Sequence, residues 1–108
     1  MLITAAADQE RATADGWTPL LRAAYHGHLE VLRLLMEAKA DQEKTSLCGS
    51  TPLSVACQMG HVEVVSLLLD GGADTNKPNA LGETPAALAS LKGHLDVLRL
   101  LAQAGEKK

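Results

Sequence analysis

Phenylalanine is absent from this 108-residue chain, and tryptophan and tyrosine occur only once each. Hydrophobic residues nevertheless make up 46% of the sequence, so a core has to be built mainly from leucine, valine and alanine. Side chains of these types suit closely packed helices better than a β-sandwich, whose strands favour aromatic and β-branched residues. A chain of this length is enough for one domain, which would bury roughly 65% of its unfolded surface.

The chain also lacks an excess of basic residues, because its net charge is −3. Proteins that bind DNA or RNA usually carry a basic patch, so we expect no nucleic-acid partner. No apolar run approaches the ~18 residues that a membrane-spanning helix needs. The first residues also lack the basic start of a signal peptide. We therefore expect no membrane partner.

Cysteine is scarce, with Cys48 and Cys57 as the two examples. They form no CxxC spacing and do not occupy equivalent positions in the repeat described next. Two unpaired thiols fit a reducing compartment better than a disulfide framework. We therefore expect the protein to be cytoplasmic or nuclear.

The sequence repeats itself every 33 residues. One motif, Gly-Xaa-Thr-Pro-Leu or its close variant Gly-Glu-Thr-Pro-Ala, recurs at residues 16–20, 49–53 and 82–86. A second motif, Gly-His followed by an aliphatic residue, an acid and valine, recurs in step with the first, at residues 27–31, 60–64 and 93–97. Two separate motifs that stay in register over three copies indicate a stacked repeat array.

Each repeat is predicted to form two short helices. The Thr-Pro pair suits a helix start, because threonine can cap the first turn and proline fits the first helical position. This first helix should run to about His26 and end at Gly27, where a left-handed residue stops it. The second should run from about His28 to about Met36. Its polar residues form a stripe only roughly 60° wide, so neighbouring repeats must cover most of its other sides.

On these two motifs the chain resembles the ankyrin-repeat family, from about Ala7 to about Gly105. The resemblance implies an all-α repeat solenoid, in which antiparallel helix pairs are joined by β-hairpin loops. We expect a single domain, residues 1–108. Within it residues 1–15 would be the end of a preceding repeat, residues 16–48 and 49–81 the first two repeats, and residues 82–108 a truncated third.

The chain departs from the family's pattern at two positions of the first helix. The family motif reads Thr-Pro-Leu-His, but the place of this histidine is taken by leucine, serine and alanine, at Leu21, Ser54 and Ala87. In addition, Arg22 stands where the later repeats have valine and leucine. A charge is easiest to tolerate there if no helix precedes the first one, so we expect Arg22 on an end surface.

The sequence predicts neither a metal site nor an active site. His28, His61 and His94 recur with the repeat, which indicates that they build the repeat rather than bind a metal. Cys57 shares its position with alanine and serine in the other repeats, as a small buried side chain would. No nucleophile, base and orienting group can be assembled from the polar residues that do not repeat. We therefore expect a protein that is not an enzyme and needs no cofactor.

The resemblance implies that hairpin tips and the exposed ends of the first helices line one concave groove that binds another protein. Both aromatic residues of the chain belong to these positions, which favours a protein-binding function because tryptophan and tyrosine often anchor interfaces. An alternative for Trp17 is that it merely covers the N-terminal end. The candidate partner-binding residues are Trp17, Tyr25, His26, Leu47, Ser50, Gln58, Met59, Leu81, Glu83, Leu91 and Lys92.

A structural, self-associating array is the competing hypothesis. Three helix pairs without evident polar caps would leave apolar end faces, and these could stack end to end, although a monomer is the first expectation. The residues expected at the two ends are Leu2, Ile3 and Leu29 at one, and Leu95, Leu98 and Ala102 at the other.

Two smaller expectations concern modification and stability. The resemblance implies that the hairpin asparagine, Asn76, is a candidate for asparaginyl hydroxylation, because Leu68 lies eight residues upstream and Asp74 lies beside it. Glu10 and Glu43 replace this asparagine in the other hairpins. One-dimensional stacking also predicts that Leu68, in the middle repeat, is better covered than its equivalent in the last helix, Leu101.

Overall fold

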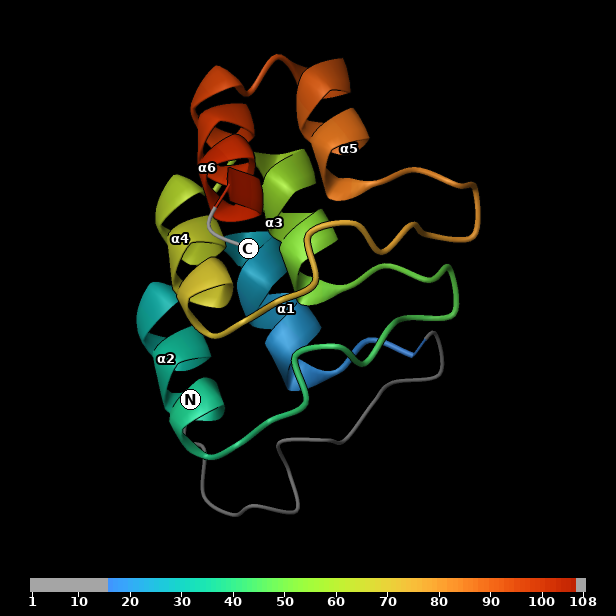
Figure 1. Cartoon of the computed structure of the whole chain (residues 1–108). Helices are drawn as coiled ribbons and strands as arrows, with labels where there is room; N and C mark the ends of the chain where they lie inside the picture. Colours follow the sequence, from blue (N-terminus) through green and yellow to red (C-terminus); the bar gives the residue numbers. More distant parts are fainter. Residues whose placement is uncertain (1–15, 107–108) are drawn as a thin grey trace.

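The computed structural model describes residues 16–106, and within them it contains three antiparallel pairs of α-helices and no assigned β-strand. Figure 1 shows α1, α3 and α5 side by side in one layer and α2, α4 and α6 in a second layer, with the connecting loops projecting to one side. The expected repeat fold is thus confirmed. The pairs are α1 Pro19–His26 with α2 Leu29–Glu37, α3 Pro52–Met59 with α4 Val62–Asp70, and α5 Pro85–Lys92 with α6 Leu95–Glu106.

The first helix of each pair begins and ends as the local sequence predicts. In each case the threonine hydroxyl accepts a hydrogen bond from the backbone N–H three residues later, at 3.0 to 3.2 Å, and proline follows the threonine. Each first helix then stops at a glycine with φ near +74°, a left-handed conformation that costs other residues energy. The capping threonines are Thr18, Thr51 and Thr84, and the stopping glycines are Gly27, Gly60 and Gly93.

In the middle repeat, serine at the family's histidine position makes a reciprocal cap. The Thr51 N–H donates to Ser54 Oγ at 2.8 Å, and the Ser54 N–H donates to Thr51 Oγ1 at 3.0 Å. Both residues are buried, so these bonds satisfy groups that water does not reach. In the other repeats the position holds Leu21, which is buried, and Ala87, which is exposed.

The core lies between the two helix layers and continues from one repeat to the next, with α3 packed against both α1 and α5. Ala24 and Cys57 lie on the side of the first helices that faces the following repeat, and both are fully buried. The small side chains at this position therefore allow close helix approach, as expected. Their equivalent Ser90 is exposed, because within the described residues no further first helix packs against α5.

The periodic histidines join successive repeats. His61 Nε2 donates to the Tyr25 carbonyl at 2.9 Å, and His94 Nε2 donates to the Gln58 carbonyl at 3.1 Å. Each imidazole lies against the glycine that ends the preceding first helix. A Cβ on Gly60 would stand only 2.6 Å from the His94 ring. These contacts confirm that the histidines at these two positions build the repeat.

The loops between pairs are closed by turns rather than by a strand ladder. In the first, the Ser46 N–H donates to the Ser50 carbonyl at 3.0 Å, and in the second the Asn79 N–H donates to the Glu83 carbonyl at 3.0 Å. The Ala80 N–H also donates to the Cys48 carbonyl at 2.9 Å, which ties the two loop tips together. The hairpin shape that the family resemblance implies is therefore present, although the loops carry no assigned strand.

Glutamate at the hairpin asparagine position links the loops at their bases. Glu43 Oε2 accepts from the Asp74 N–H at 2.9 Å, and the Glu43 carbonyl accepts from Lys77 Nζ at 3.0 Å. The side chain thus joins its own loop to the next one.

Two further expectations concern the exposure of Arg22 and the burial of Leu68 relative to Leu101. Arg22 is exposed, as expected for an end surface. Leu68 is fully buried and its equivalent Leu101 is 7% exposed. The difference has the expected direction but is small, because both leucines belong to the same core cluster. Residues 1–15, with Leu2, Ile3 and Glu10, lie outside the described residues.

Candidate functional site

The candidate partner-binding residues all lie on the loop tips or on the last turn of the first helices. Figure 1 shows that the loop tips project from the layer of α1, α3 and α5 on the side away from the second helices, whereas the last turn of each first helix lies next to the short link to its second helix. Three leucines there are strongly exposed, at 77%, 83% and 73% of their surface, namely Leu47, Leu81 and Leu91. Tyr25 and Met59 are about 40% exposed. His26 and Lys92 are also exposed, whereas Trp17, Ser50, Gln58 and Glu83 are half-buried.

The aromatic side chains form one cluster at the first repeat. Trp17 and Tyr25 meet edge to face with ring centroids 5.6 Å apart, and Tyr25 meets His26 in the same manner at 4.9 Å. His26 in turn stacks on His28, at 5.5 Å between ring centroids. Edge-to-face contacts of this kind fix ring orientation. The two aromatic residues that the sequence singled out are therefore brought together in the structure.

Beside this cluster the surface is hollowed into an open depression of about 210 Å³, lined by Trp17, Arg22, Tyr25 and His26. The guanidinium of Arg22 makes no ion pair with any described residue. An aromatic wall next to a cation suits an apolar side chain followed by a carboxylate. Sequence reasoning assigned Arg22 to an end surface and did not place it at this depression.

Two other candidate positions are occupied by contacts within the protein. Glu83 Oε1 accepts a hydrogen bond from Asn79 Nδ2 at 3.0 Å, which holds the carboxylate against its own loop. The Ser50 N–H donates to Ser46 Oγ at 3.3 Å. The three exposed leucines of the groove thus remain more accessible to a partner than these two polar residues.

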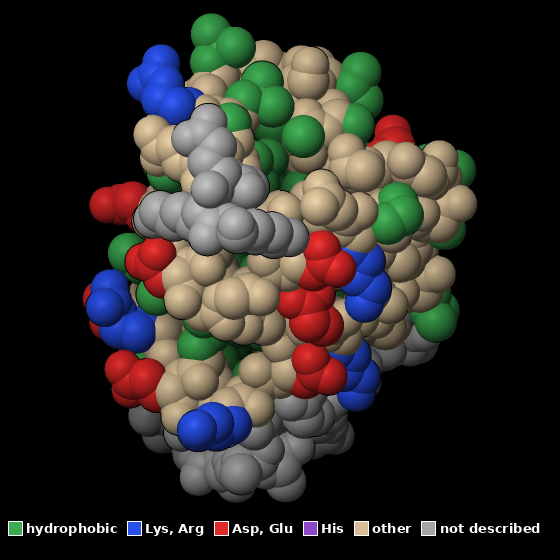
Figure 2. Space-filling view, viewed as in Figure 1, with side chains coloured by type: hydrophobic (Ala, Val, Ile, Leu, Met, Phe, Trp, Pro, Cys, Tyr) green, Lys and Arg blue, Asp and Glu red, His purple; other side chains and the backbone are tan. Residues whose placement is uncertain are grey.

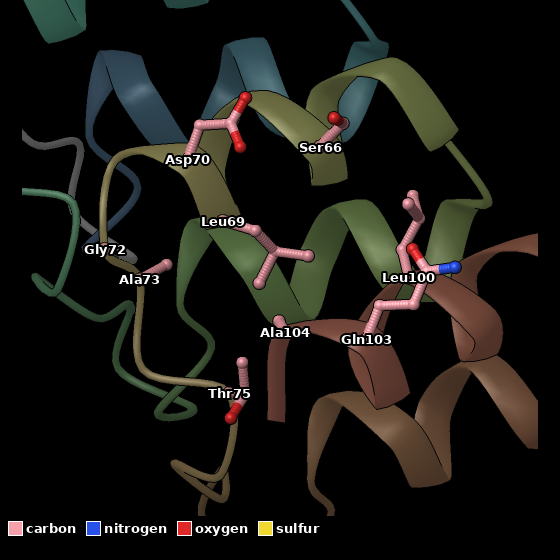
Figure 3. A pocket seen from close by; sticks show the side chains of 9 residues that line it. All are labelled: Ser66, Leu69, Asp70, Gly72, Ala73, Thr75, Leu100, Gln103 and Ala104. Atoms are coloured by element: carbon pink, nitrogen blue, oxygen red, sulfur yellow. The ribbon is translucent and has the colours of Figure 1, made fainter. Parts of the chain in front are cut away.

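A larger depression lies elsewhere, and sequence reasoning missed it. It has about 410 Å³ and lies between the C-terminal halves of α4 and α6 and the loop that follows α4 (Figure 3). Ser66, Asp70 and Gln103 line it together with Leu69 and Leu100. In the sequence these polar residues are part of the hydrophilic stripe of the second helices, so nothing distinguished them from solvated surface. Among the described residues, Asp70 is the only ionisable side chain that lines the depression.

The two thiols have different environments. Cys57 is buried among the first helices, and this burial raises the pKa of its thiol from 9.0 to about 12. Cys48 lies exposed at a loop tip. Because the thiolate is the nucleophilic form, Cys57 stays inert at neutral pH.

The described part of the chain contains neither a cluster of metal ligands nor a candidate membrane span. Across residues 16–106 no three histidine, cysteine, aspartate or glutamate side chains come together in a metal-binding arrangement. None of the described helices has the length and hydropathy required to cross a membrane.

The candidate modification site is accessible. Asn76 is exposed, and its backbone N–H donates to Asp74 Oδ1 at 2.9 Å, which forms a tight turn. Leu68, eight residues upstream, is fully buried in α4. An enzyme that reads this leucine would therefore have to bind an unfolded segment, and hydroxylation of Asn76 stays a prediction.

Comparison with known protein families gives two matches. Residues 38–108 match the family model for ankyrin repeats in three copies, and residues 15–46 match the model for the single ankyrin repeat. The two together include every described helix. A search of curated proteins finds no match.

Proposed function

We propose, because this chain belongs to the ankyrin-repeat family, that it is a non-enzymatic module which binds another protein through its concave groove. Ankyrin repeats are generally protein–protein interaction modules. The groove consists of the loop tips and the last turns of α1, α3 and α5, and its anchors are Trp17, Tyr25 and Met59.

The observation that carries this proposal is the accessible aromatic cluster of the first repeat. Trp17 and Tyr25 are the chain's only tryptophan and tyrosine, and they contact each other beside an open depression. Rigid aromatic side chains that can be desolvated by a partner dominate the energetics of most protein interfaces. Leu47 and Leu81 extend the apolar surface along the loop tips, and Leu91 extends it at the last turn of α5.

Charge at the depression points to the kind of segment that would bind. Arg22 and His26 line it, and no acidic side chain does. A partner segment with an apolar residue next to an aspartate or glutamate would complement this arrangement, because a carboxylate can pair with the guanidinium at the edge of the aromatic wall. Lys92 adds a second cation at the far end of the groove.

The proposal is tested with paired substitutions on the two faces of the protein. A partner is first captured from cell extract with the wild-type chain. Trp17→Ala with Tyr25→Ala should then weaken binding of this partner by about 2 kcal/mol or more. Arg33→Ala with Arg99→Ala, on the opposite face, is the matched control and should leave binding unchanged. Circular dichroism and urea melts verify that both variants remain folded. Equal loss of binding in the two variants would show that the groove assignment is wrong.

The fluorescence emission of Trp17 also reports directly on whether a partner occupies the groove. This emission should shift when the partner docks, because a desolvated indole emits at shorter wavelength than a hydrated one. In the Arg33→Ala, Arg99→Ala control the shift should persist. A partner that binds without any change in Trp17 emission would place the contact surface elsewhere.

A further inference from the structure

The depression between α4 and α6 has a counterpart between α2 and α4, which the chain fills with its own side chains. There a Cβ on Gly71 would stand 2.6 Å from Met36 Cε, and Gln42 Nε2 donates a hydrogen bond to the Gly71 carbonyl. One repeat later the equivalents of Met36 and Gln42 are the shorter Leu69 and Thr75, which line the depression. The depression is therefore open because two side chains of the middle repeat are shorter than those of the first.

The lining of the depression also differs in charge from the equivalent positions one repeat earlier. Ser66 and Gly72 line it, and their equivalents in the first repeat are Arg33 and Lys39. Asp70 is also part of the lining, and it makes no ion pair with any described residue. The depression therefore presents a carboxylate that no cation of the described chain neutralises.

The other lining residues suit a long side chain with a polar end. Figure 3 shows Leu69 between Asp70 of α4 and Gln103 of α6. Leu69 and Leu100 are half-buried, so they offer apolar surface to an aliphatic stem. A guanidinium can pair with a carboxylate through two parallel N–H donors and has further donors for an amide oxygen, whereas an ammonium is a point charge without this fork. The lining thus fits arginine better than lysine.

The charges around the depression do not select a cation by themselves. Figure 2 shows acidic and basic side chains interspersed along the outer edge of the second helices. Arg33 and Arg99 are paired with acids on their own helices, at 3.9 and 4.0 Å. Because salt screens exposed charges, a mixed surface of this kind attracts a cation only weakly from a distance. Selectivity has to come from contacts inside the depression.

We propose that the depression between α4 and α6 is a second protein-binding site, which takes an arginine side chain of a partner. The guanidinium pairs with the Asp70 carboxylate and donates to the side-chain amide oxygen of Gln103, while the aliphatic stem lies on Leu69 and Leu100. The site belongs to the layer of second helices, so it is separate from the groove and does not depend on the groove's function.

A short peptide provides the probe. The whole chain, labelled with ¹⁵N, is titrated with acetyl-Gly-Arg-Gly-amide, and the backbone amide signals are followed by NMR. We expect saturable shifts at Asp70, Thr75 and Gln103 with a dissociation constant of about 1–10 mM, as one side chain can supply. The same peptide with citrulline, which has the shape of arginine without its charge, should bind about fivefold more weakly. Absence of saturable shifts, or equal binding of the citrulline peptide, would overturn the proposal.

Two variants and a matched control locate the contact. Asp70→Asn should weaken binding about fivefold, whereas Glu63→Gln, which removes the same charge from an exposed position of the same helix, should leave it unchanged. Leu69→Met, Thr75→Gln and Ala104→Gly together reproduce the filled counterpart without a change of charge, so they should abolish binding. Circular dichroism verifies that each variant is folded. An equal loss in Glu63→Gln would show general attraction of charges, and undiminished binding to the filled variant would place the peptide elsewhere; either result overturns the proposal.

Other occupants of the depression are distinguished in the same titration. Replacement of the chain's own Lys107 and Lys108 by serine should change the dissociation constant less than about twofold. Binding that appears only in this variant would mean that the chain's own lysines take the place of a partner, which overturns the proposal. A peptide with lysine in place of arginine that binds as tightly would overturn the selectivity for a guanidinium. None of these outcomes depends on Trp17 or Tyr25, so the groove proposal is tested separately.

Discussion

The middle and third helix pairs follow the same sequence pattern, yet equivalent residues in them differ in burial. Val65 and Ser54 are buried in the middle pair, whereas of their equivalents in the third pair Leu98 is half-buried and Ala87 is exposed. The leucine is larger and more apolar than the valine that it replaces, so residue type does not explain the difference. Burial in this array is set by whether a repeat follows, as expected for a structure in which each repeat contacts only its neighbours.

The largest expected effect of this difference between the middle and third repeats is on leucines of the core. Leu68→Ala should lower the free energy of unfolding by about 2–5 kcal/mol, because it leaves a cavity among residues that cannot collapse fully. Leu101→Ala should lower it by a slightly smaller amount, since Leu101 is 7% exposed and Leu68 is fully buried. Urea melts of the two variants check the order. A loss at Leu101 that exceeds the loss at Leu68 would contradict the idea that the middle repeat is the best covered.

Two equivalent glycines, Gly60 and Gly93, provide a second test of the difference between the middle and third repeats. Gly60 and Gly93 both have φ of +74°, so alanine at either position should cost about 1–2 kcal/mol through the left-handed backbone alone. At Gly60 the added Cβ would also meet the His94 imidazole at 2.6 Å, whereas at Gly93 it meets nothing within 4 Å. Gly60→Ala should therefore be the more destabilising of the two in urea melts.

A double-mutant cycle isolates this contact. If His94 causes the extra cost, then His94→Ala should reduce the difference between the two glycine variants, because the clash is removed with the imidazole. A difference that persists in the His94→Ala background would mean that the strain at Gly60 has another source.

The fold could be predicted from the sequence because its signals are local. Thr18 and Gly27 mark the bounds of α1 through a side-chain cap and a left-handed residue, and these depend on no distant contact. The bounds of the second helices are predicted slightly less accurately. The second helix of the first repeat was expected to begin near His28 and end near Met36, and it spans Leu29–Glu37. No glycine or capping side chain marks its limits.

The candidate site was predicted as a set of positions, but its internal contacts were not. The resemblance to the ankyrin-repeat family implied that Trp17 and Tyr25 line the same groove, and the periodicity indicated which residues of the other repeats align with each of them. The edge-to-face contact between them and the position of Arg22 at their depression depend on side-chain rotamers, which no pattern in the sequence specifies. The exchange of asparagine for Glu43 likewise gave no indication that its carboxylate would reach the next loop.

The capping serine of the middle repeat provides a smaller test. Ser54→Ala removes the hydroxyl that accepts from the buried Thr51 N–H, so the free energy of unfolding should fall by about 1–2 kcal/mol. The reverse change, Ala87→Ser, offers the same reciprocal cap to Thr84 in the third repeat. Because position 87 is exposed, this change should alter stability by less than about 0.5 kcal/mol. If Ala87→Ser raised the free energy of unfolding by as much as Ser54→Ala lowers it, burial would not determine the strength of the cap.

The prediction with the smallest effect on stability at neutral pH concerns the two thiols. Like the equivalent residues of the two repeats, they differ in burial, because Cys57 is buried and Cys48 is exposed. At pH 7.5, iodoacetamide should modify Cys48 and leave Cys57 untouched, because burial keeps Cys57 protonated and out of reach. Peptide mass spectrometry identifies the modified residue, and Cys48→Ser should abolish labelling of the native protein.

The same burial gives the stability a defined pH dependence. The unfolded chain loses the Cys57 proton near pH 9, whereas the folded chain holds it up to about pH 12. Between these values the unfolded state binds fewer protons, so this group's contribution to stability is present below about pH 9 and declines as the pH rises above it. Cys57→Ala, which matches the alanine at position 24, should remove this decline when urea melts are compared at pH 8 and pH 10. A variant that loses stability between these pH values as steeply as the wild type would show that another group is responsible.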